Sequence, residues 1–466
     1  MTNSRLVNAT RQNDSLTENG AVTHTTSLSA CLDLFFLAGA SRNISDEGII
    51  KLFIQARAEN KDVAYRILFW ARDCRGGAGE KRFFRTIAIY CKENYSVEYE
   101  ALAILIPQYG SWKDIFMVDT PNDNVLNYLS IQLAEHDHAN LLAKYFPRKG
   151  EWFTKMHKHL GMSPKEFRKL LVSMSDTVEQ KLCAGEISKI EYGKVPSVAM
   201  NRYKNLFMRK DESRYNQYIS DIFEGKEKIN ASVLFPNDII KNIGHSNADV
   251  AQAQWDALPN YMENSTERIL PVCDVSGSMS GLPMEVSIAL GLYISERNKG
   301  IFKDAFITFS ETPAMQYVLG NKLIDRVSSL GNADWGMSTD LQKVFDLILN
   351  AATRDSLPAD EMPTKLLIIS DMEFNQADYN KPNLDVIRQK YSDSGYTMPE
   401  IIFWNVNGRV GNIPANKFDS KIGLVSGFSP SILTSVLAGK VETPEQLMLK
   451  TISKYTDVTA QLYMVA

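Results

Sequence analysis

Apolar residues recur at intervals of three and four along most of the chain from about residue 27 to residue 235. This spacing places them on one face of an α-helix. It predicts a helix in each of six stretches: LDLFFLAGA, EGIIKLFIQARA, AYRILFWARD, RFFRTIAIYCKEN, ALAILIPQYG and FRKLLVSM. Turn signals separate these stretches at Arg75-Gly76-Gly77, Pro107, Gly110 and Gly161. Helices joined by short turns indicate a stack of antiparallel pairs, as in an α-solenoid or HEAT-like repeat array.

The pattern changes after about residue 262. Four short apolar runs are typical of strands: RILPVC (268–273), DAFITF (304–309), KLLIIS (365–370) and EIIFWNV (400–406). Helical stretches lie between them, and the first of these has Pro283 in its first turn and Gly300 just past its end. Strands without polar positions are buried on both faces, and their alternation with helices is typical of a doubly wound parallel α/β domain. The predicted organisation is therefore a flexible or extended lead-in (1–26), an α-helical repeat domain (27–261) and an α/β domain (262–466).

Small polar residues follow the first predicted strand in the segment PVCDVSGSMSG. Asp274, Ser276 and Ser278 alternate there, so their three oxygens lie on one side of an extended loop. Asp371 takes the same position after a later strand, and Thr339 precedes a helix in GMSTDLQ. Ligands of open α/β sheets bind at the carboxyl ends of the strands. Because all five side chains offer hard oxygen ligands, and no His or Cys joins them, they predict a site for Mg²⁺ or another divalent cation rather than zinc.

D-V-S-G-S, a Thr on a second loop and an Asp on a third together resemble the metal-ion-dependent adhesion site (MIDAS) of von Willebrand factor A (vWA) domains. The resemblance implies that Asp274, Ser276, Ser278, Thr339 and Asp371 hold the cation, some directly and others through water. It also implies an open position that accepts an acidic group from a partner protein. In the alternative interpretation, the two serines only cap a turn, as serine often does near a helix start.

Charge is distributed unevenly along the chain. The 466 residues carry a formal net charge of −4, which favours no class of partner. Residues 141–210, however, contain 15 Lys or Arg and 6 Asp or Glu, a local charge of +9 that leaves −13 for the remainder. This asymmetry indicates a surface that faces a polyanion.

Two basic stretches lie in the predicted helical half. WARDCRGGAGEKRFFR surrounds three glycines with basic residues but lacks the GxxxxGK[ST] pattern, so it gives no support to a nucleotide triphosphatase. IEYGKVPSVAMNRYKNLFMRKDESRY interleaves basic and aromatic residues, which can neutralise phosphates and stack on unpaired bases. In the alternative interpretation, the charges form a solvated face and the aromatic rings belong to the core. The predicted RNA contacts are Arg72, Arg75, Lys81, Arg82, Arg85, Arg148, Lys149, Lys155, Lys158, Lys194, Arg202 and Lys204.

The order of these parts also carries a resemblance. An Arg-Gly-Gly turn between helices, the segment KVPSVAMNRY and a carboxy-terminal A domain are similar to an uncharacterised family with the layout of the Ro autoantigen (TROVE) proteins. In Ro-type proteins, helical repeats close into a ring against the A domain and bind small noncoding RNA and the ends of misfolded RNA. The resemblance implies RNA of this kind as a partner here.

Three functions follow from these patterns. The first is a noncatalytic, Ro-like RNA-binding protein with an Mg²⁺-binding vWA domain, and the second is a protein-assembly module whose metal site binds an acidic residue of a partner. The third is a metal-assisted hydrolase, for which Glu373 and Asp340 lie near the ligands but no general base or second metal cluster is evident. A serine hydrolase is disfavoured because no GxSxG is present and no His follows His245. We therefore predict a protein that is not an enzyme.

Cysteine usage and hydropathy predict a cytoplasmic location without a membrane partner. The five cysteines are an odd number without a CxxC, which is typical of reduced thiols in a cytosolic protein. The apolar stretch 28–40 is too short to span a bilayer and contains Asp33. The 27 mostly polar residues that precede it are unlike a secretory signal. No pattern in the sequence specifies an oligomeric state.

Overall fold

The computed structural model describes residues 14–231, 234–241, 243, 248–309, 312–331, 339–376 and 383–464, without the side chains of 14, 136–140 and 331. The chain forms two compact units that interleave along the sequence. The sheet unit comprises residues up to 83, 235–255 and 259–456. The helical unit comprises 84–234, 256–258 and the residues from 457 onward. The predicted combination of a helical region with a carboxy-terminal α/β sheet is confirmed at this level.

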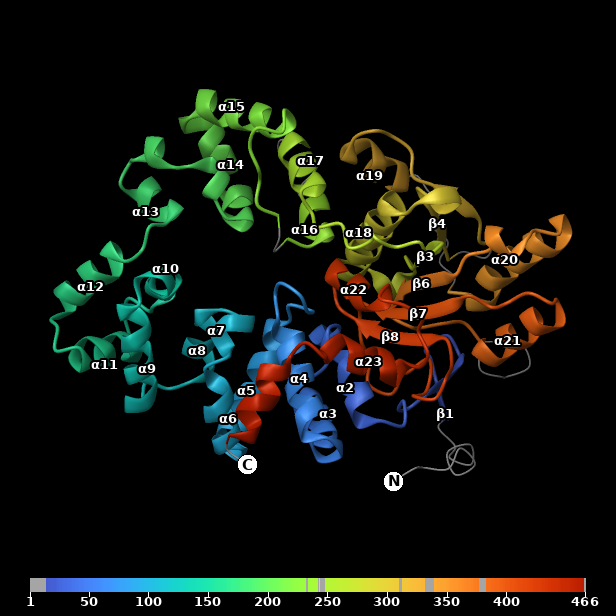
Figure 1. Cartoon of the computed structure of the whole chain (residues 1–466), viewed down its shortest axis with the longest axis horizontal. Coiled ribbons are helices and arrows are strands. Elements are labelled where there is room, and N and C mark those ends of the chain that lie inside the picture. Colours follow the sequence, from blue (N-terminus) through green and yellow to red (C-terminus); the bar gives the residue numbers. More distant parts are fainter. Residues whose placement is uncertain are drawn as a thin grey trace. The chain divides into compact units, whose positions relative to one another are not determined.

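A six-stranded sheet forms the core of the sheet unit (Figure 1). Its strands follow the order β5-β4-β3-β6-β7-β8, with bounds Met315–Tyr317, Ala305–Thr308, Ile269–Cys273, Lys365–Ser370, Glu400–Asn405 and Ile422–Ser426. Numbered along the chain, this is the 3-2-1-4-5-6 order of doubly wound α/β folds. Neighbouring strands are parallel except β4 and β5, which are antiparallel. The predicted parallel sheet is thus correct for five strands, and the sixth makes the sheet mixed.

Helices cover the sheet, and every residue of β3 and β6 is buried. The helices of this unit are α2 (Ala30–Ala38), α3 (Asp46–Glu59), α4 (Lys61–Arg72), α16 (Pro236–Ile240), α17 (Ala248–Asp256), α18 (Leu282–Arg297), α19 (Leu323–Gly331), α20 (Leu341–Asp355), α21 (Asn383–Asp393), α22 (Leu433–Val436) and α23 (Pro444–Ile452). Helix α18 packs on β3, β4 and β6. It approaches β3 so closely that a Cβ at Gly291 would lie 2.2 Å from the Cys273 sulfur. The helix ends at Arg297, two residues before the predicted end at Lys299, because Asn298 turns away to donate hydrogen bonds to the carbonyls of Ile269 and Phe302.

The first long helix, α2, packs against the edge strand β8. The Ser426 hydroxyl donates to the carbonyl of Phe35 and accepts from the amide of Gly39, both at 3.0 Å. A Cβ at Gly39 would lie 2.4 Å from the Ser426 carbonyl oxygen, so only glycine permits this approach. Residues 27–83, expected in the helical half, therefore cluster with the sheet. The division of the chain into folding domains stays a prediction.

A short hairpin precedes α2 within the segment predicted as a lead-in. Strands β1 (Asp14–Leu16) and β2 (Val22–His24) pair antiparallel. Gly20 and His24 form isolated bridges to Asn375 and Ile413 of the sheet unit. The hairpin is thus attached beside the loops that follow β6 and β7.

The helical unit is built of consecutive short helices (Figure 1). They are most of α5 (Lys81–Asn94), then α6 (Ser96–Ala103), α7 (Ile106–Tyr109), α8 (Trp112–Val118), α9 (Asp123–Ala134), α10 (His136–Tyr145), α11 (Glu151–His159), α12 (Pro164–Ser173), α13 (Val178–Cys183), α14 (Ser197–Lys210), α15 (Glu212–Phe223) and α24 (Thr456–Tyr463). Helix α24 contributes Asp457, which accepts hydrogen bonds from the Tyr109 hydroxyl at 2.6 Å and the Gln108 amide at 2.9 Å. The last described helix is thereby tied to residues far earlier in the chain.

No helix in the described part of the chain combines the length and apolar character that a bilayer span requires. All five cysteines are free thiols, of which Cys31, Cys91 and Cys273 are buried and Cys183 is exposed.

Candidate metal centre

Two of the predicted metal ligands, Asp274 and Asp371, lie where the strand order of the sheet reverses. From β3 the chain builds outward through β4 and β5, and from β6 it builds the other way through β7 and β8. Asp274 and Asp371 directly follow β3 and β6, the two adjacent strands at this switch point. The amide of Asp274 donates to the carbonyl of Ile369 at 3.0 Å, which fixes the register of the two loops. Doubly wound sheets bind their ligands in this crevice.

Asp274 is fully buried and held in one orientation. Its Oδ1 accepts a hydrogen bond from the Ser276 amide at 2.9 Å, and its Oδ2 accepts one from the Ser370 hydroxyl at 2.5 Å. The hydroxyls of Ser276 and Ser278 lie 3.1 Å apart, so the three side chains of the D-x-S-x-S segment share one small region. A turn-capping role for the serines does not account for this, because neither hydroxyl caps the short 3-10 helix that begins at Gly277.

Thr339 lies on a third loop, which is tied to the loop that follows β6. Its carbonyl accepts a hydrogen bond from the amide of Asn375, in the loop that follows β6, at 3.0 Å. The Thr339 side chain is fully buried, yet its hydroxyl has no hydrogen-bond partner among the described residues. Asp340 serves a structural role instead, because its carboxylate accepts from the Lys343 amide and caps α20.

Asp371 also carries a buried oxygen without a partner. Its Oδ1 accepts from the Glu373 amide at 3.3 Å, whereas its Oδ2 has no hydrogen-bond partner in the described part of the chain. The intervening Met372 has φ 67°, a left-handed conformation that turns the loop sharply. A buried polar atom without a partner costs about 1–3 kcal/mol, so the lone pairs of these two oxygens are available to a ligand.

The raised pKa values of Asp274 and Asp371 also favour a bound cation. Burial raises the pKa of Asp274. Burial, and then the nearby charge of Asp274, raise the pKa of Asp371 to about 6. Two buried carboxylates that repel each other are stabilised by a cation between them. The donor set of carboxylates and hydroxyls therefore fits a hard divalent cation.

Three residues that the sequence patterns did not name, Arg409, Glu18 and Asn412, form a network with Glu373 beside Asp371. The Arg409 guanidinium lies 3.9 Å from Asp371 Oδ2 and 3.5 Å from the Glu373 carboxylate, and it forms an ion pair with Glu18 of the hairpin. Glu373 also accepts hydrogen bonds from the Glu18 amide at 2.6 Å and the Asn412 amide at 2.9 Å. Glu18 and Glu373, which are bonded to each other, are 355 residues apart in sequence. No local sequence pattern could therefore have revealed this network.

The four predicted RNA contacts in the sheet unit differ in how far they are buried or paired with other residues. Arg72 is buried, with 2% of its surface exposed. Arg82 forms an ion pair with Asp46 at 2.6 Å and donates to the carbonyls of residues 41, 42 and 44. Arg75 and Lys81 are exposed.

The predicted RNA contacts in the helical unit also include residues that are paired or buried and residues that are exposed. Three form ion pairs at 2.6–2.9 Å: Arg85 with Asp114, Lys155 with Glu151, and Lys194 with Glu191. Arg148 donates to the Ala143 carbonyl, and Lys204 is buried, which lowers its pKa.

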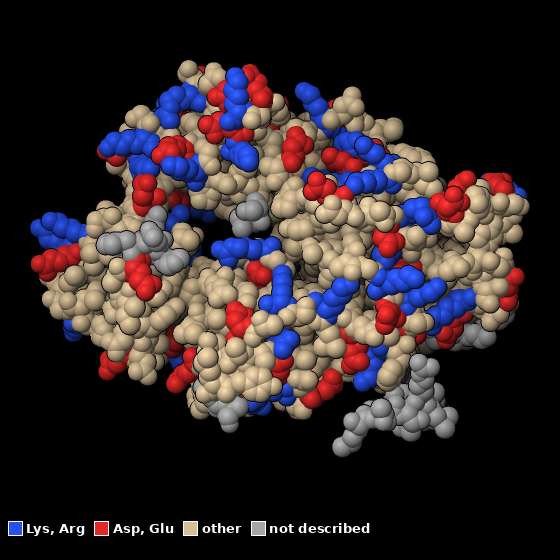
Figure 2. Space-filling model, viewed as in Figure 1, with Lys and Arg blue, Asp and Glu red and all other residues tan. Residues whose placement is uncertain are grey.

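Lys149, Lys158 and Arg202 are exposed. Figure 2 shows basic and acidic side chains interspersed on the face in view rather than one continuous basic patch. The rings of Tyr192, Phe207 and Tyr215 pack on one another with centroids 5.1–5.8 Å apart, which places these aromatic residues in the core.

Comparison with known proteins gave two family models and one relative. Residues 268–461 match a family described as "Domain of unknown function (DUF7788)", and residues 153–267 match "Domain of unknown function (DUF2828)". The "Uncharacterized protein L728" of Acanthamoeba polyphaga mimivirus is 30% identical over 505 residues, which cover 95% of this chain and 88% of that protein.

Proposed function

We propose that this chain, which belongs to the same protein family as the uncharacterised protein L728 of Acanthamoeba polyphaga mimivirus, is a noncatalytic binding protein that captures partners through a divalent cation. One observation carries the proposal. The hydroxyl of Thr339, just before α20, and Oδ2 of Asp371, just after β6, come from two separate loops, and both are buried without a hydrogen-bond partner among the described residues. These are two of the five oxygens that the MIDAS resemblance assigns to the metal.

The residues that would hold the cation, Mg²⁺ in the first instance, are Asp274, Ser276, Ser278, Thr339 and Asp371. Ser370 orients the Asp274 carboxylate, and the Ser276 amide fixes its other oxygen. Thr339 and Asp371 supply the free lone pairs. When bound, the cation supplies positive charge and an open position for the carboxylate of a partner protein.

The strand order supports the vWA resemblance of the sheet unit. A doubly wound sheet with one antiparallel edge strand places the D-x-S-x-S loop and the Asp371 loop side by side, as that resemblance requires.

A noncatalytic role is favoured because Glu373, the carboxylate two residues after Asp371, is already engaged. Glu373 accepts hydrogen bonds from Glu18 and Asn412 and lies beside Arg409. A general base must instead be free to take a proton from a substrate or water.

The test is a calorimetric titration of the chelator-treated full chain with Mg²⁺ and with Mn²⁺. We expect one site in the wild type and in the control Asp360→Asn, an exposed carboxylate outside the site. Asp274→Asn and Asp371→Asn should abolish that site. A wild-type chain that binds neither cation would refute the proposal.

A capture experiment addresses the partner. When a cell extract is passed over the immobilised chain, the wild type should retain a partner protein in Mg²⁺ and release it on addition of chelator. The Asp371→Asn chain should retain no such protein. Retention that is insensitive to chelator contradicts cation-mediated capture.

A second function, RNA binding by the helical unit, is proposed from its charge. Residues 141–210 carry +9, and Lys149, Lys158 and Arg202 are exposed there. Exposed cations of this kind contact phosphates, and their affinity for RNA falls steeply with salt.

Fluorescence anisotropy with a labelled single-stranded RNA at about 50 and about 200 mM salt tests this second function. The triple charge reversal Lys149→Glu/Lys158→Glu/Arg202→Glu should weaken binding and flatten its salt dependence. Reversal of three exposed lysines of the sheet unit, Lys303, Lys322 and Lys440, is the matched control. Equal effects of the two triple variants would exclude the helical unit as the RNA-binding part.

A further inference from the structure

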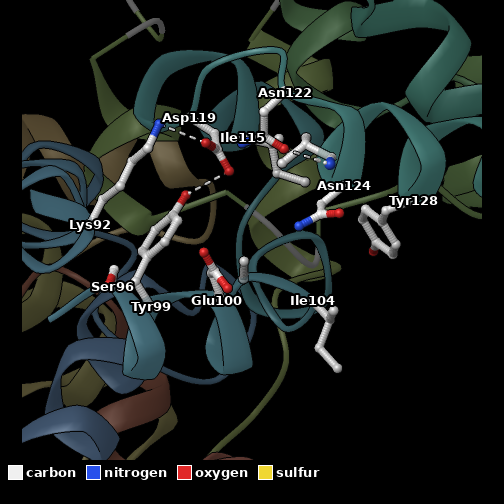
Figure 3. A pocket seen from close by; sticks show the side chains of 12 residues that line it. Lys92, Ser96, Tyr99, Glu100, Ile104, Ile115, Asp119, Asn122, Asn124 and Tyr128 are labelled. Carbon is white, nitrogen blue, oxygen red and sulfur yellow. Dashed lines mark hydrogen bonds and ion pairs between the residues drawn. The ribbon is translucent and has the colours of Figure 1, made fainter. Parts of the chain in front are cut away.

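A cavity of about 280 Å³ lies within the helical unit, between α5, α6, α8 and α9 (Figure 3). Ligand pockets in proteins range from about 300 to 1,000 Å³. This one lies just below that range, so it has room for one side chain or one small molecule.

Apolar side chains form much of its lining. Ile115 is almost fully buried, Val125 is half-buried, and Ile104 is 46% exposed at the opening. Tyr128 adds a half-buried aromatic ring at the side of the cavity (Figure 3). An apolar stem of a ligand can pack against these groups.

One of the two carboxylates in the cavity is neutralised internally. Asp119 forms an ion pair with Lys92 at 2.7 Å and accepts a hydrogen bond from the Tyr99 hydroxyl at 3.2 Å. Both contacts are visible in Figure 3. Neither Lys92 nor Asp119 is therefore available to attract a ligand of opposite charge.

The second carboxylate, Glu100 on α6, has no such partner. It forms no ion pair or hydrogen bond within the described residues, and Figure 3 shows it directed toward the space between Tyr99 and Asn124. The Asn124 amide likewise makes no hydrogen bond to the described part of the chain. The cavity thus presents one net negative charge and an unused amide beside an aromatic ring.

From this juxtaposition we propose that the cavity binds a guanidinium cation on a short apolar stem. A planar guanidinium pairs with a carboxylate through two parallel hydrogen bonds and also stacks on an aromatic face, which an ammonium group does less well. Glu100 receives the charge, Asn124 accepts a further N–H, and Tyr128 offers its ring. The stem lies against Ile104, Ile115 and Val125. The inference is independent of the metal centre in the sheet unit.

The first experiment compares n-butylguanidinium with n-butylurea, a neutral molecule of nearly the same shape, by saturation-transfer NMR titration of the full chain. We expect the cation to bind at least tenfold more tightly, the factor typical of a charge-assisted hydrogen bond. Equal binding of the two would overturn the proposal.

A blocked Gly-Arg-Gly peptide forms a second arm of the titration. Tighter binding of the peptide than of butylguanidinium supports an arginine side chain of a partner protein as the natural ligand. The reverse order supports a free alkylguanidine.

Variants of the chain complete the test. Glu100→Gln removes the charge from an exposed position, so the fold should persist and butylguanidinium affinity should fall about tenfold or more. Glu93→Gln changes an exposed carboxylate of α5 outside the cavity and should leave the affinity unchanged. If Glu100→Gln bound the cation as the wild type does, the proposal would be wrong.

Discussion

The guanidinium of Arg409 lies 3.9 Å from Oδ2 of Asp371, the carboxylate oxygen that lacks a hydrogen-bond partner among the described residues. Glu18 of the amino-terminal hairpin pairs with the same guanidinium. A fixed positive charge therefore faces the proposed cation site and partly compensates its carboxylates in the metal-free chain.

This relationship predicts that Arg409→Ala has two opposite effects. Removal of the positive charge should raise the affinity for Mg²⁺ about tenfold, because the like charge no longer opposes the cation. The free energy of unfolding of the metal-free protein should fall by about 1 kcal/mol, since Asp371 and Glu373 lose a compensating charge. Calorimetric titration and urea unfolding measure the two quantities.

Arg388→Ala is the control for Arg409. Arg388 pairs with Asp385 and Asp419 away from the site, so its loss should not change cation affinity. An Arg409→Ala chain with weaker Mg²⁺ binding would show that Arg409 supports the site rather than opposes the cation.

Thr339→Val should separate stability from binding. The substitution replaces a buried hydroxyl without a partner in the described chain by a methyl group of similar size. The metal-free protein should be as stable as the wild type or about 1 kcal/mol more stable, while Mg²⁺ affinity drops. A large loss of stability in the metal-free state, measured by thermal unfolding, would mean that the hydroxyl is satisfied there.

The raised pKa of Asp371, about 6, predicts how stability depends on pH. The folded chain binds this proton more tightly than the unfolded chain does. Protonation of Asp371 therefore contributes to the free energy of unfolding in full below the ordinary aspartate pKa, and this contribution is lost as pH rises through about 6. It amounts to about 3 kcal/mol for a shift of this size.

Urea unfolding of metal-free wild type and Asp371→Asn between about pH 4 and pH 7 isolates the contribution of this titration, because the amide cannot titrate. The difference in the free energy of unfolding between the two proteins should grow with pH. Saturating Mg²⁺ should stabilise the wild type more at about pH 7 than at about pH 5, since the cation competes with the proton. A difference that does not vary with pH would contradict the assignment.

Gly39→Ala should destabilise the sheet unit. The new Cβ would lie 2.4 Å from the Ser426 carbonyl oxygen, so α2 must shift away from β8. Overpacking of this kind costs about 1–3 kcal/mol. Gly48→Ala serves as the control, because its Cβ would meet only a side-chain carbon, Cγ2 of Ile44, at 3.0 Å and alanine favours the helix. Equal stabilities of the two variants would contradict the tight α2–β8 contact.

The central strands could be predicted because burial on both faces leaves them almost no polar residues. KLLIIS coincides with β6, and RILPVC begins one residue before β3. The two edge strands were not predicted from the sequence, and there are physical reasons for this. Strand β5 has only three residues and is partly exposed, and β8, with the sequence IGLVS, is short and contains Gly423.

The five ligand candidates could be chosen from sequence because each follows a strand or precedes a helix. Their surroundings could not be, since Arg409, Glu18 and Glu373 meet only through the tertiary fold. The basic and aromatic segment was ambiguous for a related reason: helical spacing is the same whether a ring stacks on a base or packs in a core. For Phe207 and Tyr215, both fully buried, the structure favours packing.

The interleaving of the two units along the chain also bears on how the protein is made. Asp457, which anchors Tyr109 of the helical unit, is synthesised after every strand of the sheet. The helical unit therefore lacks this contact until the sheet has been translated. Incompletely packed helices expose apolar surface, which favours aggregation and chaperone binding. Expression of either unit alone requires a redesigned chain with rejoined segments, because no single cut separates the two.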